Sequence, residues 1–130
     1  MRLLLDTQVA LWWLVGSSRL NRVSRDLIVT SSCVVSAASI WEVAIKHRLG
    51  KLPIPPQLFR DHMQNAGATL LPIADVHAIA TTEVPVGHHD PFDRLLLATA
   101  QIEHLVLLTG DEGLLRLGRL EPTLPVKAAR

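Results

Sequence analysis

The sequence has no tyrosine and a single cysteine, and aromatic residues make up only 4% of its 130 positions. One cysteine cannot close an intramolecular disulfide. Because Cys33 lies inside an apolar run, we expect a buried thiol without a catalytic role. So few aromatic rings also disfavour a surface that binds single-stranded RNA by stacking on its bases.

Long hydrophobic runs are missing as well, although 48% of the residues are hydrophobic. No segment approaches the roughly 20 apolar residues that a membrane-spanning helix needs, so we expect no membrane partner. No basic, hydrophobic leader opens the sequence, which predicts a cytoplasmic protein. The apolar surplus instead predicts a protein partner or a homodimer. A formal net charge of +1 neither indicates nor excludes a nucleic-acid partner, because a local basic patch decides that.

What the sequence does contain is an alternation of short apolar runs and longer helical patterns. Strands are predicted at residues 2–5, 33–36, 67–72 and 105–109, with a last edge strand near 124–126. Helices are predicted at 9–14, 18–30, from Ser36 or Ser39 to about 49, and at 57–65, 76–83 and 91–100; residues 85–89 are expected to be a loop. Such continuous apolar strands separated by helices predict one domain, a three-layer α/β/α sandwich around a mainly parallel sheet.

Residues 90–100 carry the clearest helix signal. Asp90 suits the N-cap and Pro91 the first helical position. Asp93 then falls on the apolar face of this helix, over Leu96 and Ala100. An inward carboxylate is costly unless a positive group meets it. Asp93 is therefore either a metal ligand or a residue that complements the helix dipole.

Three other acids belong to the same pattern. Asp6 and Asp111 follow predicted strands, so both fall at the carboxyl ends of parallel strands, and helical spacing predicts that Glu42 faces the core with Ile45 and Leu49. Each has a simpler explanation: Asp6 and Asp111 as caps, and Glu42 as the i,i+4 partner of Lys46. Four converging carboxylates nevertheless favour a divalent cation.

The histidines do not supply a zinc motif. His88 and His89 are adjacent and do not both turn inward easily, so we expect them to contact solvent, RNA or a partner.

Four motifs, in order and spacing, resemble one family: PIN-domain endoribonucleases of the VapC toxin type. They are Leu3-Leu4-Leu5-Asp6-Thr7, Ser36-Ala37-Ala38-Ser39-Ile40-Trp41-Glu42, His89-Asp90-Pro91-Phe92-Asp93-Arg94-Leu95-Leu96 and Leu107-Leu108-Thr109-Gly110-Asp111. The resemblance covers nearly the whole chain and implies a single PIN domain over residues 1–130. It also implies Mg²⁺- or Mn²⁺-dependent hydrolysis of RNA, with Asp6, Glu42, Asp93 and Asp111 as metal ligands and catalytic residues. Asp90 is then the N-cap or an outer-shell ligand.

Residues around these acids have two interpretations each. Thr7, Ser36 and Thr109 either orient the carboxylates or serve as ordinary capping groups. Arg94 and Lys46 are candidates for binding RNA phosphates.

The resemblance also implies a cognate antitoxin and a homodimer. Trp12 and Trp13 point about 100° apart on one helix, so either both are buried or one lines a groove for an antitoxin helix. Two other functions remain: a non-catalytic PIN-like module that binds RNA or protein, and a metal-dependent DNA nuclease.

Overall fold

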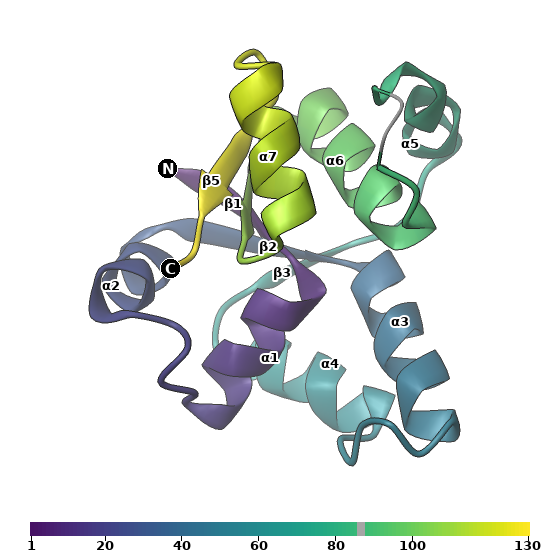
Figure 1. Cartoon of the computed structure of the whole chain (residues 1–130). Coiled ribbons are helices and arrows are strands. Elements are labelled where there is room, and N and C mark those ends of the chain that lie inside the picture. The colour runs from purple at the N-terminus through teal and green to yellow at the C-terminus, as the bar shows by residue number, and fades with distance from the viewer. Residues whose placement is uncertain (86–87) are drawn as a thin grey trace.

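The computed structural model describes residues 1–85 and 88–130 and contains a five-stranded, fully parallel sheet (Figure 1). The strand order is β3-β2-β1-β4-β5. The strands are β1 (Arg2–Leu5), β2 (Ser32–Ser36), β3 (Thr69–Leu71), β4 (Val106–Thr109) and β5 (Val126–Ala128). The predicted last strand is an edge strand, although it starts one residue after Pro125.

Helices cover both faces of the sheet, which confirms the predicted α/β/α sandwich (Figure 1). One layer holds α1 (Thr7–Val15), α2 (Arg22–Thr30) and α4 (Pro56–Asn65), and the other holds α5 (Asp75–Ala80), α6 (Pro91–Glu103) and α7 (Glu112–Leu120). Helix α3 (Ala37–Arg48) follows β2 and contributes Ala38 to one core cluster and Val43 to the other.

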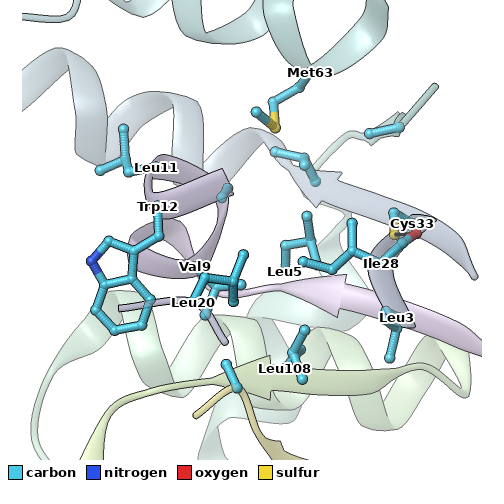
Figure 2. Close-up of a cluster of buried hydrophobic side chains, with 14 of the residues drawn as sticks. Leu3, Leu5, Val9, Leu11, Trp12, Leu20, Ile28, Cys33, Met63 and Leu108 are labelled. Atoms are coloured by element: carbon cyan, nitrogen blue, oxygen red, sulfur yellow. Dashed lines mark hydrogen bonds between the residues drawn. The ribbon is translucent and has the colours of Figure 1, made fainter. Parts of the chain in front are cut away.

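The central strand shows how the pleat divides the core. Leu3 and Leu5 point into the cluster under α1, α2 and α4, which Figure 2 shows, whereas Leu4 points into the cluster under α6 and α7. All three side chains are fully buried. Alternate residues of a strand face opposite sides, so β1 needs apolar residues at every position.

Several predicted helix boundaries were wrong. Helix α2 begins at Arg22 instead of residue 18, because Asn21 is its N-cap and accepts a hydrogen bond from the Ser24 N–H (2.8 Å). The helix predicted at 76–83 begins at Asp75, ends at Ala80 and continues as a 3₁₀ turn, η1 (Thr81–Glu83).

Helix α7 was not predicted at all. It carries Gly113 and Gly118, and glycine is among the poorest helix formers, so the local pattern hides a helix that buries Leu114 and Leu117. Of the loop predicted at 85–89, residues 86–87 lie outside the described residues.

Among the helices of the described residues, none combines the length and the apolar character that crossing a bilayer requires.

Candidate metal centre

The predicted acids gather where the strand order reverses. From β1 the chain adds β2 and β3 on one side, and later β4 and β5 on the other. Asp6 directly follows β1, and Asp111 follows β4 after one glycine. Open parallel sheets form their ligand crevices at the carboxyl ends of the strands at such a switch point. One pocket here is lined by Asp6, Glu42, Asp90, Asp93 and Asp111.

Asp6 is the most deeply placed of these acids, with 5% of its surface exposed. It stands at the N-cap position of α1, but within the described residues its side chain makes no capping hydrogen bond. The carboxylate instead accepts a hydrogen bond from the Thr109 hydroxyl (2.6 Å). Burial raises the pKa of Asp6 to about 6, and the negative charges of Glu42 and Asp111 add to this against the Thr109 hydrogen bond.

Thr109 contacts two of the acids. Its hydroxyl donates to Asp6 and accepts from the backbone N–H of Asp111 (3.0 Å). The Asp111 carboxylate accepts from the Leu114 N–H (2.9 Å) and caps α7 while it lines the pocket. Capping and pocket lining are therefore compatible at this residue.

The other two predicted hydroxyls serve helix α3. Ser36 is its N-cap and accepts from the Ala38 N–H (3.0 Å). Thr7 donates to the buried Ser39 hydroxyl (2.8 Å), which joins α1 to α3. In the described part of the chain neither hydroxyl bonds to a carboxylate.

Asp93 and Asp90 differ sharply. Asp90 is the N-cap of α6 and accepts from the N–H groups of Phe92 (2.9 Å) and Asp93 (3.1 Å), as predicted. Asp93 is mostly enclosed and lies 2.8 Å from His88, Oδ2 to Nε2. Burial raises the pKa of Asp93 to about 7, against the His88 hydrogen bond, and the charges of Asp6, Asp90 and Asp111 add to the rise.

Glu42 reaches the pocket from α3 but does not face the core, which corrects the prediction from helical spacing. Its supposed neighbours Ile45 and Leu49 are 36% and 62% exposed. Helix α3 instead buries the face of Ser39 and Val43, because it packs against α1, α4 and α6. The Glu42 carboxylate pairs with the Lys46 ammonium at 2.8 Å.

Basic side chains line the same pocket as the acids. Lys46, a predicted phosphate ligand, lines the pocket together with Arg19 and Arg130, neither of which sequence reasoning identified. The Arg130 guanidinium lies 5.5 Å from the centre of the Trp12 ring. No local motif marks Arg19 or Arg130, because only the fold brings them to this edge of the sheet.

Arg94 takes a different position from the predicted one. Its guanidinium donates to the backbone carbonyls of Thr81 (2.8 Å), Val84 (2.9 Å), Pro85 (3.2 Å) and His88 (2.9 Å). It is not among the described residues that line the acidic pocket. These four hydrogen bonds tie the segment before α6 to the helix, so phosphate binding by Arg94 would require them to break.

The donor set fits a divalent cation. Several carboxylates share one pocket, and two of them have raised pKa values because burial and mutual repulsion disfavour their charged forms. A bound cation offsets both effects. Carboxylate oxygens are the ligands that Mg²⁺ and Mn²⁺ prefer.

The fold and the pocket together define an α/β protein with a carboxylate site at the topological switch of a parallel sheet. The PIN domain family matches residues 3–120. The chain belongs to the PIN-domain family.

One sequence relative and two solved structures are similar to this chain. A segment of 53 residues is 43% identical to Ribonuclease VapC16 of Mycobacterium tuberculosis, and it covers 38% of this chain and 37% of that protein. The fold resembles VapBC2 from Rickettsia felis bound to a promoter DNA fragment (TM-score 0.71, 12% identity, 100% of both chains). It also resembles DNA-bound VapBC from Salmonella typhimurium (TM-score 0.67, 18% identity, 100% of this chain and 99% of that one).

Proposed function

We propose that this protein is a metal-dependent endoribonuclease, the toxin of a type II toxin–antitoxin pair, acting through a single PIN domain over residues 1–130. The observation that carries the proposal is the pocket shared by Asp6, Glu42, Asp93 and Asp111. These four acids come from four separate segments, and membership of the PIN family supports a nuclease. The 43% identity to a ribonuclease supports RNA as the substrate.

The four acids would hold Mg²⁺ or Mn²⁺. When bound, such an ion supplies an activated water and stabilises the negative charge that develops on a phosphodiester in in-line displacement. The protein's own residues prepare the site: Thr109 orients Asp6 and positions the Asp111 backbone through two hydrogen bonds. A carboxylate that is already held in one orientation loses less conformational entropy when it binds a cation than a mobile carboxylate does.

RNA phosphates would lie on the basic rim of Arg19, Lys46 and Arg130, which frames the acids. Contacts to phosphate position a nucleic acid without reading its bases. This suits a chain with few aromatic side chains for stacking. We place the reaction in the cytoplasm, where such RNA is available.

An antitoxin is the proposed protein partner, since VapBC structures share this fold, and we propose that it binds as a helix. An apolar groove between α1 and residues 51–54 is lined by Leu11, Val15 and Ile54. It shares Trp12 and Lys46 with the acidic pocket. A helix lying in this groove would reach the site that it inhibits.

Cleavage assays test the proposed activity. We expect the purified protein to cleave RNA with Mg²⁺ or Mn²⁺ and to be inactive in excess EDTA. Asp6→Asn should fold and lose cleavage, because it removes a ligand but keeps an acceptor for the Thr109 hydroxyl.

The same assay distinguishes the alternatives. Full activity in EDTA contradicts metal dependence, and metal-dependent cleavage of DNA alone indicates a DNA nuclease. RNA binding without cleavage in any metal indicates a non-catalytic module.

A further inference from the structure

His88 is a candidate ligand at this site that an all-carboxylate description leaves out. It precedes α6, and its ring is mostly enclosed, with 13% of the side chain exposed. His88, Asp93 and Asp111 each offer a ligand atom, and these atoms lie within 4.8 Å of one another. His88 therefore stands inside the acid cluster, in contrast to the exposed neighbour His89.

The backbone of His88 is held in place from the helix that carries Asp93. Arg94, the next residue along α6, donates to the His88 carbonyl at 2.9 Å. Its three further hydrogen bonds go to the carbonyls of Thr81, Val84 and Pro85. Arg94 therefore holds the His88 backbone close to α6. The His88 ring can then reach Asp93, the residue that precedes Arg94.

A glycine leaves room for the ring. A Cβ atom at Gly113 would lie 3.0 Å from His88 Cε1 and 3.0 Å from Asp111 Oδ2. Gly113 is in the first turn of α7, where glycine costs about 1 kcal/mol of helix stability relative to alanine. The missing side chain lets the imidazole and the Asp111 carboxylate approach the same point.

We propose that His88 is a ligand of the ion held by Asp93 and Asp111, so that this site favours Mn²⁺ over Mg²⁺. The proposal rests on the metal-dependent function proposed above. Neighbouring ligands of an octahedral ion, each about 2.1 Å from the metal, lie about 3 Å apart. The separation between His88 Nε2 and Asp93 Oδ2 is 2.8 Å.

The metal preference follows from the donor type. Mg²⁺ takes oxygen ligands almost exclusively, whereas Mn²⁺ prefers oxygen but, as a transition-metal ion, also accepts an imidazole nitrogen. If His88 instead only donated a hydrogen bond that orients Asp93, its loss would weaken the binding of both ions alike.

Pulsed electron paramagnetic resonance of Mn²⁺ added to the full chain tests ligation directly. We expect ¹⁴N coupling of a bound imidazole in the wild type and in the matched control His89→Gln, but not in His88→Gln. Calorimetric titration should show that His88→Gln lowers Mn²⁺ affinity about tenfold more than Mg²⁺ affinity.

Gly113→Ala provides a second route to the same measurement if His88→Gln folds poorly. The added methyl group should weaken Mn²⁺ binding and its ¹⁴N coupling, because it would crowd both the His88 ring and the Asp111 carboxylate, and circular dichroism checks that the variant folds. Mn²⁺ binding by the wild type without ¹⁴N coupling, or equal losses for both ions in His88→Gln, overturns the role of His88 alone. Absence of any Mn²⁺ or Mg²⁺ binding by the wild type overturns the proposed metal-dependent function as well.

Discussion

At the scale of single residues, the charged forms of Asp93 and Asp6 are unfavourable in the metal-free fold. Their pKa values rise from 3.8 to about 7 and about 6. The folded state thus binds these protons more tightly than the unfolded state. The stability of the metal-free protein should fall as pH rises through the window from about 4 to 7.

Asp93→Asn removes the larger of these two shifts. At pH 8 without metal we expect a higher free energy of unfolding, by on the order of 1–3 kcal/mol, and a weaker loss of stability between pH 5 and pH 8. The same substitution should abolish RNA cleavage and reduce the stabilisation by added Mg²⁺. Thermal melts at both pH values, with and without Mg²⁺, measure these effects.

Asp90→Asn is the matched control. Asparagine caps a helix about as well as aspartate, so this variant should melt close to the wild type and keep measurable activity. If Asp93 only complemented the helix dipole, Asp93→Asn would lose about 0.3–1 kcal/mol and stay active. An inactive Asp90→Asn beside an active Asp93→Asn would move the metal ligand to Asp90.

At the scale of elements, the end of β4 packs against α1 beside the acidic pocket. Trp12 is buried (7% exposed) in the cluster that Figure 2 shows, and Trp13 is partly buried. A Cβ atom at Gly110 would lie 2.7 Å from two atoms of the Trp12 ring. Gly110 also directly precedes Asp111, so the fit of one tryptophan affects the position of a metal-site acid.

Gly110→Ala should therefore destabilise the fold by about 1–3 kcal/mol, as overpacking does, and should reduce cleavage. Denaturant titration gives the stability. In a Trp12→Leu background the ring is absent, and we expect the cost of Gly110→Ala to shrink. An equal cost in both backgrounds would contradict the steric explanation.

At the scale of the whole molecule, an apolar hollow lies between α3, α5 and α6. Trp41 is 59% exposed on α3 and packs edge-on against Phe92, with 5.3 Å between the ring centres. Ile45 and Leu95 line the same hollow. Exposed apolar patches are typical of protein interfaces, so this face is the place to test the predicted homodimer.

If the predicted homodimer uses this face, Trp41→Glu should give a folded monomer, because a carboxylate would be desolvated in the interface. Sedimentation velocity measures the mass, and circular dichroism checks the fold. Leu58→Glu on α4, where Leu58 is 53% exposed, is the control and should stay dimeric. A monomeric wild type would refute the homodimer.

Local sequence determined most of the fold and the acids of the candidate site. Unbroken apolar runs such as residues 2–5 require burial on both faces, and that burial predicts a parallel sheet between helices. Asp6 and Asp111 directly follow such runs, so parallel geometry alone brings them to one edge. The caps Asp90 and Ser36 were also predictable, because capping depends on residues two or three positions away.

Tertiary structure alone decided what depends on distant contacts. The Thr109 hydroxyl donates a hydrogen bond to Asp6, which is 103 positions away in the sequence. No local pattern places Arg130 beside Trp12. His88 turns to Asp93 while His89 stays exposed, because Arg94 holds the His88 backbone and Gly113 leaves space for its ring. Helical spacing predicted that Glu42 lies on the buried face of α3. The packing of α3 against its neighbours buries a different face. Periodicity reports which side chains share a face, whereas the packing of the whole chain decides which face is covered.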